Sequence, residues 1–208
     1  MRSPRDGPVE PLSDDYGFDR GTPLDRRYID GFLRARRALI RGSVLEVEDD
    51  TYTTRFGTGV TTSTVVDIDR SNARATLIAD LEQPGSLAAG TYDCIILTQT
   101  LHLLRDPGLC VENCYRALRP GGVLLATAPS VSRVSPTYPD GDYWRFTRAG
   151  IAELFARHWG GSHTALGLGN LRSCIGFLLG ESVDEIAEEV LDLHDPRFPL
   201  TVAVEARR

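Results

Sequence analysis

The feature that most constrains the fold is a regular alternation of short apolar strand segments with helical segments. Seven strand segments are predicted, at residues 44–47, 63–68, 75–79, 92–97, 123–129, 164–168 and 200–205. Helical periodicity predicts helices at residues 24–39, 108–118, 148–158 and 183–193. Such alternation favours an α/β fold in which helices cover both faces of a mainly parallel sheet.

The chain of 208 residues fits one domain of ordinary size. Residues 1–22 are rich in Pro, Gly, Asp and Arg without hydrophobic periodicity, which predicts a flexible or folded-over arm. Residues 23–208 are predicted to form a single domain. The segment between the first two strands is short and rich in threonine, so we expect the first crossover helix to be truncated.

Composition excludes several classes of function. All 23 basic residues are arginine, so chemistry that needs a Schiff-base, pyridoxal-phosphate or P-loop lysine is excluded. The same bias would also follow from a GC-rich coding genome. A net charge of −6 argues against nucleic-acid binding. The chain shows neither a secretory signal nor an apolar stretch of the roughly 20 residues that span a bilayer, which predicts a cytoplasmic protein that does not bind membranes.

Four cysteines fit that compartment. Cys94 lies in an apolar strand, Cys110 and Cys114 are one helical turn apart, and Cys174 stands alone. The pair at one-turn spacing could share a metal ion, but no cluster of histidine and cysteine completes a site. Reduced thiols and no metal are therefore expected.

Polar residues follow the first four strands. Glu46 and Glu48 come at the end of the first, Asp69 after the second, Asp80 after the third and Gln99 after the fourth. The carboxyl ends of parallel strands meet at one edge of a sheet, and ligands bind there near the point where strand order reverses. These side chains are therefore candidates for one ligand site.

The ordered set of motifs resembles a larger family. The acidic strand ends, the strand YDCIIL at 92–97, the turn LRPGG at 118–122 and the strand VLLATAP at 123–129 are similar to class I S-adenosylmethionine-dependent methyltransferases. The resemblance covers about residues 24–206. It implies a Rossmann-like, doubly wound, seven-stranded sheet with an antiparallel edge hairpin. The arginine-rich arm and the segment YWRFT at 143–147 resemble a bacterial subgroup of that family.

The resemblance also implies roles for the strand-end residues. Asp69 would accept hydrogen bonds from the cofactor's ribose hydroxyls, with Asp67 as the alternative two residues earlier. Asp80 would accept from the adenine amino group, with the Leu81 N–H on the ring. Glu46 would lie near the amino-acid tail of S-adenosylmethionine. Each acid could instead be solvated at a strand end, but three at matching positions favour binding.

One position departs from the family pattern. Glu48 stands where a glycine-rich loop lets the backbone approach the ligand. Its side chain is expected to crowd the cofactor, and its charge to repel the carboxylate tail. Tyr28 is predicted to contact the cofactor in compensation. The arm is expected to supply an arginine for the tail carboxylate or the substrate, namely Arg20, Arg26 or Arg27.

Residues for the acceptor are expected on the same rim. His102 is the candidate general base, or else a packing residue at the start of the next helix. Tyr143, Trp144 and Arg145 would form an acceptor wall, or else pack their own loop. Gln99 would touch the cofactor or the acceptor.

The leading hypothesis is therefore methyl transfer from S-adenosylmethionine to a small molecule such as a sugar, a nucleoside or a natural-product intermediate. One alternative is a methyltransferase-fold enzyme that binds a different nucleoside for non-methylation chemistry. The other is a catalytically silent scaffold domain. A homodimer is possible under each of these three hypotheses.

Overall fold

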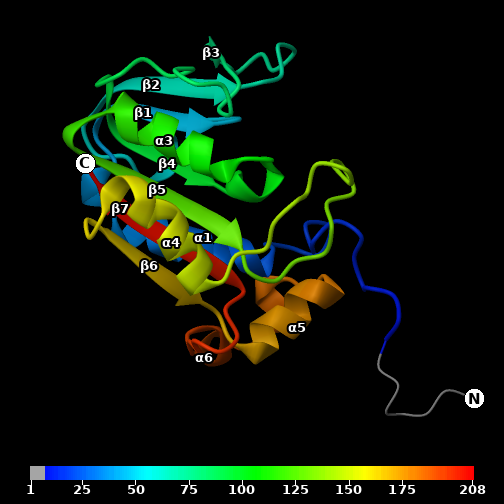
Figure 1. Ribbon diagram of the computed structural model, residues 1–208. Coiled ribbons are helices and arrows are strands. Elements are labelled where there is room, and N and C mark those ends of the chain that lie inside the picture. Colours follow the sequence, from blue (N-terminus) through cyan, green and yellow to red (C-terminus); the bar gives the residue numbers. More distant parts are fainter. Residues whose placement is uncertain (1–7) are drawn as a thin grey trace, which may run out of the picture.

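The computed structural model describes residues 8–208 and contains one seven-stranded sheet in the order β3-β2-β1-β4-β5-β7-β6 (Figure 1). The strands are β1 Gly42–Val47, β2 Val60–Asp67, β3 Leu77–Ile78, β4 Tyr92–Thr98, β5 Leu118–Pro129, β6 His163–Leu168 and β7 Thr201–Arg207. The pairs from β3 to β5 are parallel, and β7 pairs antiparallel with both β5 and β6. The predicted fold class is thus confirmed, with an antiparallel pair at one edge.

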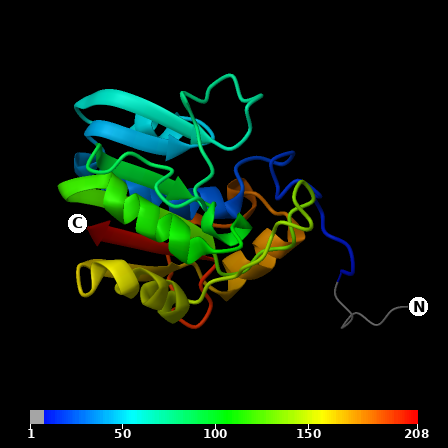
Figure 2. The same cartoon turned by 45° about the horizontal axis from the view of Figure 1, so that its top comes forward.

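Helices cover both faces of the sheet. The α-helices are α1 Leu24–Ala35, α2 Thr51–Phe56, α3 Pro107–Ala117, α4 Arg148–Trp159, α5 Leu171–Leu179 and α6 Glu188–Leu191. Short 3-10 helices are η1 Arg37–Leu39, η2 Leu101–Leu103 and η3 Val183–Glu185. Figure 2 shows α3 and α4 layered on one face, while the buried residues of α1 and α2 pack on the other. The crossover between β1 and β2 carries only the six residues of α2, as its composition predicted.

The alternation of side chains along the central strands builds these two cores. In β4, Ile95 and Leu97 join the core under α3 and α4, while Cys94 and Ile96 join the core under α1 and α2. All four side chains are fully buried. Burial of one such aliphatic side chain is worth roughly 1.5–3 kcal/mol, so a strand buried on both faces anchors the sheet.

The predicted elements differ from the observed ones mainly in the connection between β6 and β7. The predicted helix at 183–193 is divided into η3 and α6, and α5 was not predicted. α5 begins with a capping box in which the side chains of Asn170 and Ser173 bind each other's backbone N–H. It ends at Gly180, whose φ is +77°.

The carboxyl ends of the parallel strands point toward the side where the arm, α5 and the loop at residues 130–147 gather (Figure 1). The arm lies against α5: the Leu12 N–H donates to the Leu179 carbonyl at 2.6 Å, and the rings of Tyr16 and Phe177 stack at 5.8 Å. This arrangement places the beginning of α1 at the same rim as the ends of β1 and β4.

Candidate functional site

Strand order reverses between β1 and β4, which are adjacent in the sheet. The residues that follow these two strands, Glu48 and Gln99, have left-handed backbones with φ of +72° and +47°. Among residues 8–208 the only other non-glycine residue with positive φ is Tyr16. Left-handed backbone is costly for residues with a Cβ atom and concentrates at functional sites. Backbone strain therefore marks the switch point, where open α/β sheets bind ligands.

Glu46 shapes the loop that follows β1. Its side chain is buried, and its two carboxylate oxygens accept from the N–H groups of Tyr52 at 2.9 Å and Thr53 at 2.7 Å. Burial raises the pKa of Glu46 above its ordinary value, while the hydrogen bonds with Thr53 and Tyr52 oppose the rise. Both oxygens are thus used within the protein. Glu46 is a positioning residue for the loop and α2 rather than a free partner for the cofactor tail.

Asn72 holds Glu48 in its left-handed conformation. The Asn72 side-chain amide donates to the Glu48 carbonyl at 2.7 Å and to Asp67 Oδ2 at 2.7 Å. The Glu48 N–H donates to the Val66 carbonyl at 2.9 Å. The backbone at Glu48 thus has a conformation typical of glycine. The Glu48 side chain is exposed and places a carboxylate at the tip of the loop.

The two candidate ribose ligands differ in their surroundings. Asp67 accepts from Asn72 and, at 2.9 Å, from the Asp69 N–H, so its carboxylate is engaged within the loop. Asp69 is exposed and accepts from the N–H and hydroxyl of Ser71 at 2.8 and 2.9 Å, which lower its pKa. Asp69 is therefore ionised and accessible, which favours it over Asp67.

Asp80 lies just after β3 and accepts from the Glu82 N–H at 2.8 Å and from the Gln83 side chain at 3.2 Å. The neighbouring Leu81 is buried, and its carbonyl accepts from the Asn113 side chain at 2.9 Å. The turn is thus fixed on α3, with the partly exposed Asp80 carboxylate at its surface.

The three arginines expected to bind the cofactor tail or the substrate have different partners. Arg20 is paired with Glu185, and Arg27 is paired with Asp192 at 2.6 Å. Arg26 has no carboxylate of residues 8–208 within ion-pairing distance. The ion pairs of Arg20 and Arg27 therefore hold the arm and α1 in place. Of the three arginines, only Arg26 is without an ion pair within residues 8–208 and can bind a ligand.

Tyr28 was predicted to contact the cofactor, and the structure places it elsewhere. It is buried in a small core between α1, α5 and α6, where its hydroxyl donates to the Leu191 carbonyl at 3.1 Å. Burial raises the pKa of the Tyr28 hydroxyl. Tyr28 is a packing residue, because its helical position faces the core rather than the strand ends.

His102 lies in η2, directly beyond β4. Burial is the main cause that lowers its pKa to about 4, the nearby Arg145 also lowers it, and Asp142 opposes the change. Its Nδ1 is buried without a hydrogen-bond partner among the described residues. The His102 carbonyl accepts from the N–H groups of Tyr143 at 2.8 Å and Trp144 at 3.2 Å. His102 is therefore neutral at pH 7 and sits under the loop at residues 130–147.

That loop is clasped by Arg145, which was predicted to contact substrate. Its guanidinium forms a two-point ion pair with Asp142, at 2.5 and 2.8 Å, and donates to the Arg133 carbonyl at 2.6 Å. The Asp142 side chain is only 2% exposed. Arg145 is thus a structural residue of the loop, because its donors are already used.

The neighbouring aromatic residues remain accessible. Tyr143 and Trp144 are 38% and 45% exposed, and the Trp144 indole N–H donates to the Leu104 carbonyl at 2.8 Å. The Arg105 guanidinium lies 5.3 Å from the Tyr143 ring centre. Both side chains stay partly exposed, so an acceptor wall is compatible with the geometry.

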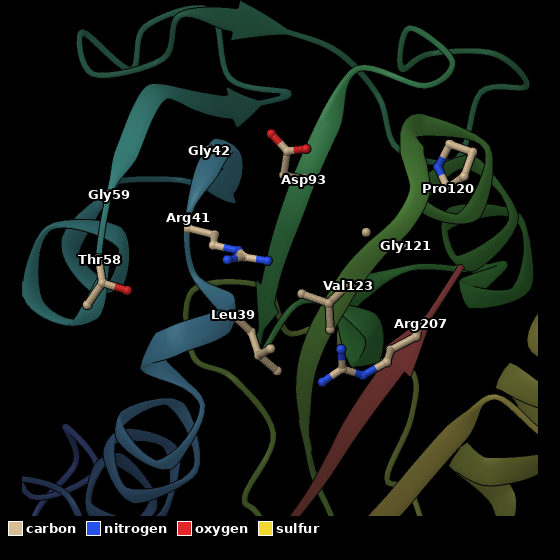
Figure 3. A pocket seen from close by; sticks show the side chains of 11 residues that line it. Leu39, Arg41, Gly42, Thr58, Gly59, Asp93, Pro120, Gly121, Val123 and Arg207 are labelled. Atoms are coloured by element: carbon tan, nitrogen blue, oxygen red, sulfur yellow. The ribbon is translucent and has the colours of Figure 1, made fainter.

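A hollow of about 680 Å³ lies at the opposite end of the strands (Figure 3). The hollow is open and polar, and Arg41 and Arg207 point into it beside Asp93. Gly42 and Val123 place it at the amino ends of β1 and β5. None of the predicted site residues line it. Ligands of open α/β sheets bind at the carboxyl ends, so the candidate site is the strand-end rim.

Residues 51–126 match the family model described as a methyltransferase domain. The match covers part of the chain, from α2 to within β5. This match supports the predicted enzyme class, an S-adenosylmethionine-dependent methyltransferase, and with it the predicted cofactor. The matched range begins directly after the altered loop at residues 46–50. A comparison with curated proteins found no significant match.

Solved structures share the fold at low identity. An S-adenosylmethionine-dependent methyltransferase from Mesorhizobium loti has a TM-score of 0.61 at 16% identity, over 89% of this chain and 100% of that one. The N-methyltransferase NodS from Bradyrhizobium japonicum, in complex with S-adenosylhomocysteine, has a TM-score of 0.56 at 14% identity, over 95% and 93% of the two chains. The [4+2]-cyclase SpnF has a TM-score of 0.59 at 14% identity, over 97% and 87%.

The sequence interpretation assigned no role to three residues of the strand-end rim. The side chain of Asn72 donates to the Glu48 carbonyl, Tyr52 lies beside Arg26, and Asp142 pairs with Arg145. Only Asp142 had a sequence signal, because it stands three positions before an arginine. The four cysteines are buried free thiols, and residues 8–208 contain no cluster of metal-ligating side chains.

Proposed function

We propose that the chain transfers a methyl group from S-adenosylmethionine to a small-molecule acceptor, a sugar, a nucleoside or a natural-product intermediate. The observation that carries the proposal is the backbone strain at Glu48 and Gln99, on the two strands that flank the switch point. Strain of this kind persists where the surrounding structure enforces it for a function. The methyltransferase-domain match gives that function its chemical class.

The residues at the rim suit this cofactor. Asp69 presents an ionised, accessible carboxylate for the ribose hydroxyls, and Asp80 presents a partly exposed carboxylate for the adenine amino group. When bound, S-adenosylmethionine supplies a methyl group on a positively charged sulfur. The acidic rim of Glu48, Asp69 and Asp80 is complementary to that charge.

For the acceptor, positioning supplies much of the rate, and a base is needed only where the acceptor must lose a proton. His102 is neutral and can take that proton, although its low pKa makes it a weak base. Tyr143 and Trp144 would stack on a flat acceptor or on the apolar face of a sugar. Acceptor selection would then rest on the loop at residues 130–147.

Calorimetric titration with S-adenosylmethionine and S-adenosylhomocysteine tests the proposal. We expect micromolar binding to the wild-type chain and at least tenfold weaker binding to Asp69→Asn. The variant Glu189→Gln, which changes an exposed carboxylate on α6, serves as the matched control. Absence of binding by the folded wild-type chain would overturn the proposal.

A second candidate is non-methylation chemistry in the same cleft. Two observations favour it: the loop after β1 departs from the glycine-rich pattern, and a protein described as a [4+2]-cyclase shares the fold. Under this candidate an adenosine-containing ligand other than S-adenosylmethionine would bind more tightly in the same titration. A silent scaffold domain would bind none of them. The bacterial subgroup, the cytoplasmic location and a homodimer stay predictions; no helix within residues 8–208 could cross a membrane.

A further inference from the structure

Most backbone N–H groups of the loop after β1 already have an acceptor within the protein and are not free for a ligand. The N–H groups of residues 48, 49, 51, 52 and 53 all donate within the protein, to the carbonyls of Val66 and Val47 and to the carboxylates of Asp49 and Glu46. A loop that binds an anion does so with free N–H groups. With five of these N–H groups engaged, a side chain is the better receptor for the carboxylate of the cofactor's amino-acid tail.

Arg26 is placed to be that side chain. It lies in the first turn of α1, and its Nη1 is 3.4 Å from the Tyr52 hydroxyl at the start of α2. Its guanidinium lies 5.8 Å from the centre of the Phe18 ring. These contacts hold the guanidinium between the arm and the loop. A guanidinium has five N–H donors, so a fork remains for a planar carboxylate.

Glu48 supplies the opposite charge. It is the residue directly after β1, its side chain is exposed, and α2, whose Tyr52 contacts Arg26, begins three positions later at Thr51. Burial lowers the pKa of Arg26, and the neighbouring Asp25, Tyr52 and Glu48 raise it by more than burial lowers it. A cation and an anion separated by more than ion-pairing distance fit a zwitterion between them.

We propose that Arg26 and Glu48 together bind the zwitterionic amino-acid group of the cofactor, Arg26 its carboxylate and Glu48 its ammonium. This inference rests on the proposed function, since it assigns one end of the same ligand. Helix α1 thus replaces the glycine-rich loop as the receptor for the tail. The carboxylate at position 48, which would repel the tail's carboxylate, instead faces its ammonium.

The experiment compares ligands that share adenosine but differ in the tail, by calorimetric titration of the full chain. S-adenosylhomocysteine has the complete tail, its decarboxylated form keeps only the ammonium, and 5′-methylthioadenosine has neither charge. On the wild-type chain, loss of the carboxylate should weaken binding by about 10- to 100-fold, the range of charge-assisted hydrogen bonds. Equal binding of the first two ligands would overturn the assignment of Arg26 without any variant.

The variants Arg26→Met and Glu48→Gln then locate the two contacts. Arg26→Met should weaken S-adenosylhomocysteine by about 10- to 100-fold while changing 5′-methylthioadenosine less than twofold. Glu48→Gln should weaken the decarboxylated ligand several-fold. The control Arg27→Met changes the next position of the same helix, which is paired with Asp192, and should change no affinity.

The failures can be told apart. If the folded wild-type chain binds none of the three ligands, the proposed function fails and this inference fails with it. If the wild-type chain binds all three but Arg26→Met weakens them equally, or weakens none, only the tail assignment fails.

Discussion

The side-chain amide of Asn72 donates to the main-chain carbonyl of Glu48 at 2.7 Å, and so ties the loop after β2 to the residue that occupies a glycine position after β1. The same amide group binds Asp67 Oδ2. The left-handed conformation of the loop after β1 is therefore stabilised by a contact with the neighbouring loop after β2, at a position without glycine.

Replacing Asn72 should loosen this rim. Asn72→Ala removes the donor to Glu48 and the donor to Asp67, so we expect the free energy of unfolding to fall by about 1–3 kcal/mol. Urea denaturation measures the change. Arg74→Ala, on an exposed residue of the same loop, should change it by less than about 0.5 kcal/mol. An unchanged midpoint for Asn72→Ala would contradict the clamp.

Relief of strain at position 48 should stabilise the fold. Glycine adopts φ of +72° without the cost borne by residues with a Cβ atom, and this gain exceeds the entropy that glycine loses on folding. We expect Glu48→Gly to raise the free energy of unfolding by about 0.5–1 kcal/mol. Glu48→Ala keeps the strain and should bring no such gain. Equal effects of the two substitutions in thermal denaturation would rule out strain at this residue.

The buried His102 should make stability depend on pH. Its folded pKa of about 4 lies below the ordinary 6.5, so the unfolded chain binds the proton more readily. The free energy of unfolding should therefore fall as pH falls from about 6.5 toward 4, by up to about 3 kcal/mol.

The groups that act on His102 are Asp142 and Arg145, both on the loop above it. The variant His102→Gln removes the titration, so between pH 4.5 and 7 its free energy of unfolding should depend less on pH than that of wild type. This range avoids most of the carboxylate titration. If wild type and variant show parallel pH profiles, His102 is not a buried neutral histidine.

Removal of Arg145 should release the loop at residues 130–147. Arg145→Met leaves the buried Asp142 carboxylate with the Ser135 N–H, at 2.8 Å, as its remaining hydrogen-bond donor. Breaking a buried ion pair in this way costs about 3 kcal/mol or more. Limited proteolysis should show faster cleavage within the loop. The exposed neighbour Arg148→Met is the control, and equal cleavage of both variants would contradict the clasp.

The parts that sequence predicted are those fixed by local pattern. The run YDCIIL at 92–97 gave a strand buried on both faces, and Asp69 and Asp80 were placed on one rim because parallel strands end together. The ion pairs of two predicted site arginines could not be predicted, because they depend on residues far away in the sequence. Arg20 and Arg27 pair with carboxylates more than 150 positions away, which no local spacing reveals.

Other misses had a signal that a closer interpretation could have used. Asn170 and Ser173 stand at capping-box spacing before an apolar run that ends at Gly180, which together indicate α5. Tyr28 falls on the same helical stripe as the core residues Ile29 and Phe32, so its burial follows from periodicity.

The most direct test of the central claim is a crystal structure of the chain with S-adenosylhomocysteine. The account predicts that the nucleoside lies over the carboxyl ends of β1, β2 and β4, with its ribose on Asp69 and its adenine beside Asp80. A nucleoside bound instead in the hollow lined by Arg41 and Arg207 at the amino ends of the strands would contradict it.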